Sequence, residues 1–271
     1  MLPPSQDTGG LKSMIKIANA FDHGKAFIAF VTGGDPTLGV TEKLIPAMAQ
    51  AGADLIEIGL PFSDPVAEGI VIQEANERAL SAGCTTDKLF DMLKRVSPTV
   101  DVPMVFLTYL NPIYTYGKES FMARCVECGV SGLIVPDMPF EEKDELKSVC
   151  EKYGVEIVSM IAPTSHERIS MIAKDAKGFV YCVSSMGVTG MRSEITTDIG
   201  GMVKLVKSVT DTPVAVGFGI STPEQAGEMA ALADGAIVGS AIVRIVAQYG
   251  EECVEPVCEC IRQMKKAVLM A

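Results

Sequence analysis

The sequence predicts a single α/β domain folded as a closed (β/α)8 barrel, the TIM-barrel architecture. Eight short apolar runs recur along the 271 residues, and stretches with helical periodicity separate them. The runs begin about 30 residues apart on average, a spacing that fits one strand and one helix per unit. They are apolar throughout, which is typical of parallel strands covered on both faces.

The elements follow in order along the chain. The expected strands are residues 26–32, 55–61, 103–110, 132–137, 156–163, 179–185, 213–220 and 235–241. Helical periodicity is clear at 41–52, which ends in a C-capping glycine, and at 86–96. Pro46 inside the first of these stretches is expected to start or kink its helix. The stretch 222–233 opens with a capping Ser or Thr and a proline, as helix N-termini do.

No linker or composition break divides the chain. We therefore expect residues 14–271 to form one barrel domain and residues 1–13, MLPPSQDTGGLKS, to be a disordered N-terminal extension. An open doubly wound sheet is the alternative. Against it, no GxGxxG follows the first expected strand, where a dinucleotide site would place it.

Composition excludes several classes of function. A net charge of −11 argues against nucleic acid and anionic membranes as partners. No apolar run approaches the ~18 residues of a membrane helix, and the N-terminus lacks a secretory signal. Eight cysteines without such a signal indicate reduced thiols in the cytoplasm. The chain has one CxxC, at 125–128, and only two histidines, so we expect no metal site. So few histidines also argue against Ser-His-Asp or Cys-His catalysis.

The C-terminal ends of the strands are where a barrel carries its functional residues. Gly, Pro, Asp, Asn and Ser gather after every expected strand, although ordinary turns use the same residues. GFG at 217–219 and VGS at 238–240 each precede a helix start, where free backbone N–H groups favour a phosphate. Tight glycine-rich turns without a ligand are the alternative.

Three acids and a tyrosine are candidates for chemistry. Glu57 is the third residue of its expected strand and points into the barrel near the mouth. Burial there raises the pKa of a carboxyl group and suits it to general acid or base catalysis. A structural carboxyl bound by backbone or a hydroxyl is the alternative. Tyr181 lies inside FVYCV and is core by default, with a hydroxyl that needs a partner. Asp64 and Glu68 share the loop 60–72, and spacing alone does not choose between them.

Seven motifs, in order and spread over the whole barrel, resemble those of the tryptophan synthase α-subunit family. They are KAFIAFVTGGDP, LIEIGLPFSDPVAEG followed by IQ, NPIYTYG, GLIVPDMP, SSMGVTGMR, PVAVGFGIS and GAIVGSAIV. The resemblance runs from about Met14 to the C-terminus. It implies a lyase of tryptophan biosynthesis that cleaves indole-3-glycerol phosphate to indole and glyceraldehyde 3-phosphate by a retro-aldol reaction, with no metal or organic cofactor.

The resemblance also implies the catalytic residues. Glu57 corresponds to the family's proton shuttle, and Tyr181 is a further catalytic candidate. The family's second carboxylate is an aspartate at the position of Glu68, so Glu68 inherits that role and Asp64 becomes a loop brace. Glutamate is longer by one methylene, about 1.5 Å. Ile70 stands where the family usually has a proline.

The remaining family sites transfer residue by residue. The implied indole pocket consists of Phe30, Leu107, Ile134, Ile161, Tyr181 and Phe218. Thr189 would hold the second carboxylate when its loop closes. The implied phosphate site consists of Gly190, Gly217, Phe218, Gly219, Gly239 and Ser240. A PLP-dependent β subunit would dock on 60–72 and 111–117 to form an αββα heterotetramer, with PLP only in the β subunit.

Two other functions stay open at this point. One is a catalytically weak α-like subunit that mainly binds and regulates the β subunit, because of Glu68. The other is a different phosphate-binding barrel, such as a sugar-phosphate isomerase, which would need a different acid in the second strand and different loops.

Overall fold

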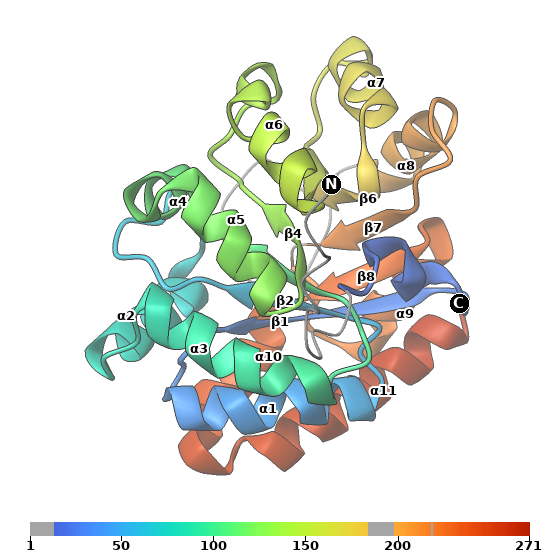
Figure 1. The fold of residues 1–271 in the computed structure, drawn as a ribbon. Helices are drawn as coiled ribbons and strands as arrows, with labels where there is room; N and C mark the ends of the chain where they lie inside the picture. The colour runs from blue at the N-terminus through green and yellow to red at the C-terminus, as the bar shows by residue number, and fades with distance from the viewer. Residues whose placement is uncertain (1–13, 184–197, 218) are drawn as a thin grey trace, which may run out of the picture.

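The fold is a closed barrel of eight parallel strands (Figure 1). The computed structural model describes residues 14–183, 198–217 and 219–271. The strands follow one another in chain order around the barrel, and β8 pairs with β1 to close it. The predicted (β/α)8 barrel is therefore confirmed. The expected extension 1–13 lies outside the described residues, as do Thr189, Gly190 and Phe218.

Each of the eight predicted apolar runs overlaps a strand, and the fourth and sixth strands begin two residues before their predicted runs. The strands are β1 (Ala26–Thr32), β2 (Leu55–Gly59), β3 (Met104–Leu107), β4 (Val130–Ile134), β5 (Glu156–Ile161), β6 (Lys177–Val183), β7 (Val214–Gly217) and β8 (Gly235–Val238). Most end before the predicted run does, because the Pro, Gly and Ser residues that follow belong to the loops.

Helices surround the barrel in an outer ring (Figure 1). Those described are α1 (Leu38–Ala51), α2 (Ile70–Ser81), α3 (Thr86–Val96), α4 (Leu110–Tyr116), α5 (Lys118–Glu127), α6 (Asp144–Tyr153), α7 (His166–Lys174), α8 (Ile199–Lys207), α9 (Pro223–Leu232), α10 (Ser240–Tyr249) and α11 (Val254–Leu269), with the 3-10 turns η1 (Ile17–Phe21), η2 (Ser97–Thr99), η3 (Phe140–Glu142) and η4 (Gly250–Glu252). None of the helices in these ranges has the length and apolarity that a membrane crossing requires.

Local sequence signals account for several helix ends. Thr222 caps α9 in a reciprocal capping box with Gln225, so the predicted cap is confirmed. Helix α1 ends, as predicted, at Gly52, whose φ of 114° is left-handed. It runs through Pro46 instead of starting there, because the Thr37 side chain caps it at its first turn by accepting from the Val40 N–H.

Two hydrophobic layers lie on opposite sides of the strands. Leu55 packs inside the barrel with residues such as Val105 and Phe179, above the 3-10 turn at Ile17–Phe21. Ile56 and Ile58 belong to the outer layer between strands and helices. Because side chains alternate along a strand, Glu57 shares the inner face with Leu55.

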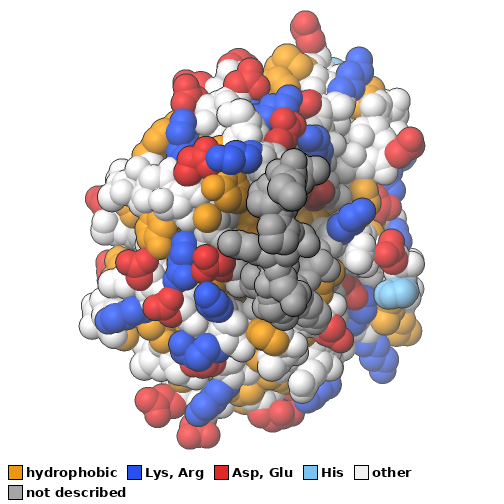
Figure 2. Space-filling view, in the orientation of Figure 1, with side chains coloured by type: hydrophobic (Ala, Val, Ile, Leu, Met, Phe, Trp, Pro, Cys, Tyr) orange, Lys and Arg blue, Asp and Glu red, His pale blue; other side chains and the backbone are white. Residues whose placement is uncertain are grey.

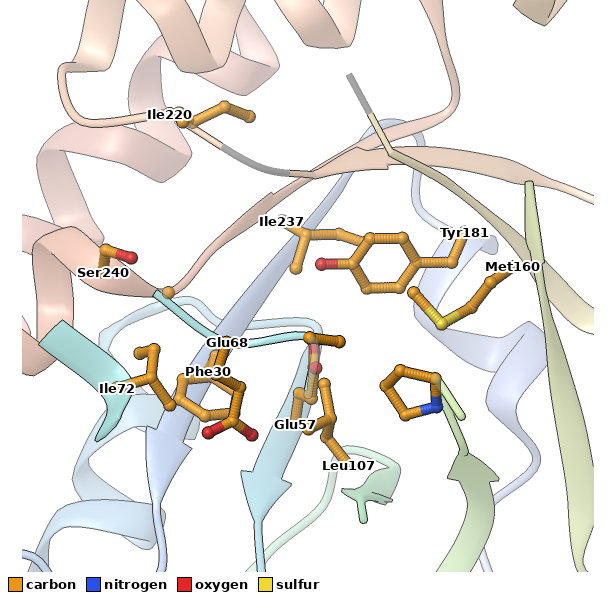
Figure 3. A pocket seen from close by; sticks show the side chains of 14 residues that line it. Phe30, Glu57, Glu68, Ile72, Leu107, Met160, Tyr181, Ile220, Ile237 and Ser240 are labelled. Atoms are coloured by element: carbon orange, nitrogen blue, oxygen red, sulfur yellow. The ribbon is translucent and has the colours of Figure 1, made fainter. Parts of the chain in front are cut away.

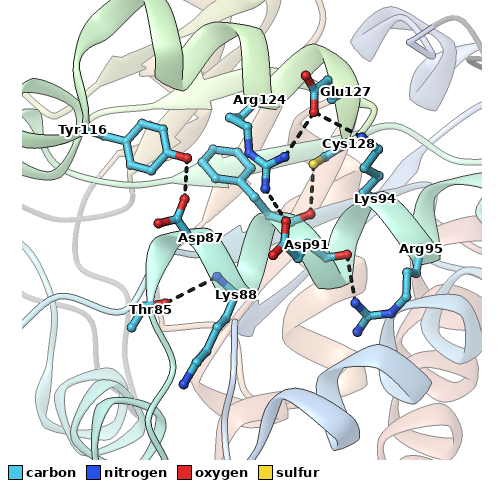
Figure 4. A network of polar contacts seen from close by, with 11 residues as sticks. Thr85, Asp87, Lys88, Asp91, Lys94, Arg95, Tyr116, Arg124, Glu127 and Cys128 are labelled. Carbon is cyan, nitrogen blue, oxygen red and sulfur yellow. Dashed lines mark hydrogen bonds and ion pairs between the residues drawn. The ribbon is translucent and has the colours of Figure 1, made fainter.

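Helices α3, α4 and α5 are joined by a polar network (Figure 4). Arg124 contacts Asp91 at 2.5 Å and Glu127 at 3.1 Å, and the Tyr116 hydroxyl donates to Asp87 at 2.6 Å. The Cys128 thiol donates to the carbonyl of Phe90 at 3.0 Å. Cys128 is buried, and burial raises its pKa to about 11, so this CxxC cysteine is an unreactive packing group.

The face shown in Figure 2 carries acidic and basic side chains interspersed with one another. Exposed side chains of opposite charge pair at several places on the protein, as Arg95 does with Glu42 at 2.8 Å and Lys152 with Glu119 at 2.7 Å. Such exposed pairs contribute little to stability.

Candidate active site

A cavity that is open at its mouth lies at the C-terminal ends of the strands (Figure 3). Side chains from six of the eight strands reach it, together with residues of the following loops. Its lining is Phe30, Glu57, Ala67, Glu68, Ile72, Leu107, Pro136, Met160, Tyr181, Gly219, Ile220, Ile237, Gly239 and Ser240. The cavity is largely apolar, with two carboxyl groups and two hydroxyl groups as its polar side chains.

Glu57 lies on β2 with 1% of its surface exposed. Its Oε2 atom is buried and has no hydrogen-bond partner among the described residues. Burial, and secondarily the charge of Glu68, raises the pKa of Glu57 to about 8. The carboxyl group therefore keeps its proton at neutral pH and is able to donate it to a ligand in the cavity.

Glu68 ends the loop before α2 and is 6% exposed. The Asn76 amide donates to its Oε2 at 2.7 Å, and the Gln73 amide donates to its main-chain carbonyl at the same distance. Burial raises the pKa of Glu68, whereas hydrogen bonds from Asn76 and Tyr109 oppose the rise by stabilising the anion. The two cavity acids are thus in different environments: within the described residues Glu57 Oε2 has no hydrogen-bond partner, whereas Glu68 Oε2 accepts from Asn76.

Asp64, the other acid of this loop, is exposed and outside the cavity lining. Its carboxylate accepts a hydrogen bond from the neighbouring Ser63 hydroxyl. The structure therefore brings Glu68, and not Asp64, to Glu57. The alternation of the strand predicted where Glu57 points, but spacing within an irregular loop gave no such information for these two acids.

Tyr181 lies on β6 and its side chain enters the cavity. Burial, and secondarily the charge of Glu57, raises its pKa well above the ordinary value, so the phenol stays protonated. Gly217 makes room for it, because a Cβ atom there would lie 2.5 Å from the Tyr181 hydroxyl oxygen. Gly217 was predicted as a phosphate-binding residue; in the structure it packs against this ring and does not line the cavity.

The predicted indole-pocket residues divide into two groups. Phe30, Leu107 and Tyr181 line the cavity. Ile134 packs in the barrel interior without lining the cavity, and Ile161 belongs to the outer layer.

Strand alternation explains the departure at β5. Adjacent residues of a strand point to opposite sides, so Met160 faces the cavity and Ile161 faces away from it. The alternation along β5 is regular, with Val158 and Met160 on the inner side and Ile157 and Ile161 on the outer side; Ile161 was expected from the family resemblance and not from this alternation. Ile72, Ile220 and Ile237 are further lining residues that the sequence did not single out.

Gly219, Gly239 and Ser240 meet at another part of the cavity wall. Gly219 has a φ of 80°, which favours glycine. Gly239 is the N-cap residue of α10. Because glycine has no side chain, no N-cap side chain accepts hydrogen bonds from the first-turn N–H groups of that helix. Such an N-terminus suits an anionic group.

Comparison with known proteins agrees with this geometry. A family model described as "Tryptophan synthase alpha chain" matches residues 17–269. The tryptophan synthase alpha chain of Lacticaseibacillus casei is 46% identical over 255 residues, which cover 94% of this chain and 96% of that protein. That of Methanocaldococcus jannaschii is 46% identical over 246 residues, covering 88% and 87%.

Solved structures show the same likeness. The tryptophan synthase subunit alpha of Legionella pneumophila superposes with a TM-score of 0.86 at 32% identity, over 95% of this chain and all of that one. A chain of Mycobacterium tuberculosis tryptophan synthase gives a TM-score of 0.84 at 31% identity, over 93% and 97%.

Proposed function

The chain belongs to the tryptophan synthase alpha chain family, and we propose that Glu57 and Glu68 are the acid–base pair of its reaction. It is a lyase that splits indole-3-glycerol phosphate into indole and glyceraldehyde 3-phosphate. One observation carries the assignment of residues: two buried carboxyl groups share a single, largely apolar cavity, and only that of Glu68 accepts a hydrogen bond from Asn76.

The reaction needs one proton delivered and one removed. Indole C3 gains a proton, which places positive charge on the ring nitrogen. The bond from C3 to the glycerol carbon then breaks, its electrons return to the ring, and the hydroxyl on that carbon loses its proton as the aldehyde forms. Protons balance without an oxidant or reductant, so we propose that this chain uses no metal or organic cofactor.

Glu57 is suited to both proton transfers. With a pKa of about 8 it donates to C3 at neutral pH, and the resulting carboxylate then accepts the hydroxyl proton. Glu68 supplies negative charge that stabilises the positively charged ring. Tyr181 offers a phenolic donor, and Phe30, Leu107 and Ile237 pack against the indole ring in the largely apolar cavity.

The phosphate group of the substrate is assigned to the part of the cavity wall that Gly219, Gly239 and Ser240 form. Gly219, Gly239 and Ser240 would hold it through backbone N–H groups at the start of α10 and the Ser240 hydroxyl. The assignments of Gly190, Gly217, Phe218 and Thr189 to ligand binding, and of Ile134 and Ile161 to the indole pocket, remain expectations from the family.

The family implies a β-subunit partner. We propose an αββα complex in which this chain docks through 60–72 and 111–117, with PLP in the β subunit. Exposed apolar side chains in these two segments, Val66, Ile70 and Tyr114, support that face. The free cysteines are consistent with the proposed cytoplasmic location, and the acidic charge gives no basis for a nucleic acid partner.

The direct test is indole release from indole-3-glycerol phosphate by the purified protein, with and without its β subunit. We expect indole in both cases and a faster rate in the complex. An absence of indole in both would overturn the assignment. A protein that raises β-subunit turnover yet releases no indole would instead be the binding and regulatory subunit, an alternative that the comparisons do not favour over the lyase.

A further inference from the structure

We propose that Asn76 is a positioning residue for the reaction. From inside helix α2 it holds the Glu68 carboxylate and thereby sets where the second carboxylate stands relative to Glu57. The inference rests on the proposed roles of these two acids, and it adds a residue that does not line the cavity.

Asn76 is an unusual residue for its place. It is 3% exposed and lies on the buried side of α2 with Ile72, Ala75 and Ala79. Asparagine is a poor helix former, and a buried amide destabilises the fold unless it is hydrogen-bonded. Its amide donates to Glu68 Oε2 at 2.7 Å, a bond strengthened by charge when the carboxylate is ionised.

Helix α2 also holds the main chain of Glu68. The Gln73 amide donates to the Glu68 carbonyl at 2.7 Å, and Tyr109 receives a hydrogen bond from the Ala67 N–H at 3.3 Å. The helix is itself fixed to the β1 loop by the two bonds between Arg78 and Asp35, each 2.8 Å. The place of the carboxylate is therefore determined by a rigid element and not by the loop alone.

The glutamate length matches this arrangement. Figure 3 shows the Glu68 carboxyl group on the side of the cavity occupied by Phe30 and Ile72. An aspartate on the same backbone would end about 1.5 Å short of the amide and lose a bond that is now 2.7 Å long. Asn76 and Glu68 thus form a matched pair, because the amide lies at the distance that a glutamate side chain reaches and an aspartate side chain does not.

A double-mutant cycle on indole release tests the inference. The proteins are the wild type, Asn76→Ala, Glu68→Gln and the double variant, each assayed in complex with the β subunit. We expect Asn76→Ala to lower kcat about tenfold with KM changed less than about threefold, because misplacement of about 1 Å has large effects on rate. In the Glu68→Gln background, Asn76→Ala should alter kcat less than about twofold, because the carboxylate that Asn76 positions has already been replaced by a neutral amide.

Two controls separate positioning from structural damage. Ala79→Gly weakens the same buried face of α2 without touching Glu68, and Glu77→Ala changes an exposed position of the helix. Both should keep kcat within about twofold of wild type. Equal losses from Asn76→Ala in the two backgrounds, or an equal loss in Ala79→Gly, would overturn the inference.

Hydrogen exchange keeps this test independent of the proposed function. Amides of residues 60–69 should exchange faster in Asn76→Ala than in wild type or Glu77→Ala. If the wild type releases no indole, the proposed function fails while this readout still decides whether Asn76 holds the loop. If the amides of residues 60–69 exchange at the wild-type rate in Asn76→Ala, Asn76 does not hold the loop and the positioning role is wrong.

Discussion

Glu57 has its chemical character because its carboxyl group is buried and its Oε2 atom has no hydrogen-bond partner in the described part of the chain. An ionised carboxylate loses most of its hydration in this apolar cavity, so the proton stays on to about pH 8. Glu68 is also buried, yet Asn76 and Tyr109 stabilise its charge. The different surroundings of these two glutamates underlie the separate roles of acid and anion proposed for them.

The burial of Glu57 predicts a conflict between activity and stability. Because its native pKa of about 8 lies above the ordinary 4.5, the native state binds the extra proton across this window. The free energy of unfolding should therefore fall by about 1.4 kcal/mol per pH unit from about pH 4.5 to about pH 8. Glu57→Gln removes this dependence, and we expect it to stabilise the protein by roughly 3 kcal/mol at pH 7.

Urea unfolding at pH 5, 7 and 9 measures that difference, and indole release and phosphate binding are assayed on the same samples. Turnover by Glu57→Gln should be abolished with phosphate affinity retained. A variant that is active, or whose stability follows the wild-type pH dependence, would contradict the role given to Glu57.

Glu68→Asp tests whether the longer acid suits this chain. The shorter side chain loses the Asn76 bond, so we expect kcat to fall about tenfold or more. The reaction rate of the variant with the β subunit present is the measurement, and unchanged binding of glyceraldehyde 3-phosphate is the control. A rate above that of the wild type would show that the extra methylene misplaces the anion.

At the scale of elements, α2 connects the site to the barrel. It carries Asn76 and Gln73 toward Glu68, and it is joined to the β1 loop by the pair of Arg78 with Asp35. Asp35 is 1% exposed, and burial raises its pKa even beside the guanidinium. A carboxylate so placed depends on Arg78 for its stability.

Arg78→Met should therefore destabilise the protein by about 3 kcal/mol, because it leaves a buried charge without its partner. Equilibrium unfolding in urea measures the loss. Adding Asp35→Asn to the variant should recover part of it. Arg95→Met is a matched control that breaks a similar two-bond pair with Glu42 on the surface, and it should cost less than about 1 kcal/mol. Similar losses in the two single variants would contradict the buried-charge argument.

The elements also show how far sequence reasoning reached. Uninterrupted apolar runs predicted all eight strands, because parallel strands covered on both faces need them. Helix α1 was harder to predict, since its cap at Thr37 and its packing override the local effect of Pro46. In the site, alternation located Glu57, whereas the family resemblance named Ile161 and the alternation of β5 places its neighbour Met160 in the cavity instead.

The barrel as a whole brings distant residues together. Phe30 of β1 and Ile237 of β8 are far apart in sequence but line one cavity, because β8 closes against β1. Separate strand ends thus supply the proposed acid, the apolar walls and the helix N-terminus proposed to bind the phosphate. Loop conformation, in contrast, has no periodicity, so the choice of Glu68 over Asp64 needed the family resemblance or the structure.

The pH dependence of indole release tests the central claim, that a protonated Glu57 acts beside an ionised Glu68, most directly. The account predicts that kcat in the complex, measured from pH 5 to 10, falls at high pH with a limb near pH 8, where Glu57 loses its proton. Indole release that keeps rising above pH 9 would contradict it, because the acid assigned to C3 would then be ionised while the reaction continued.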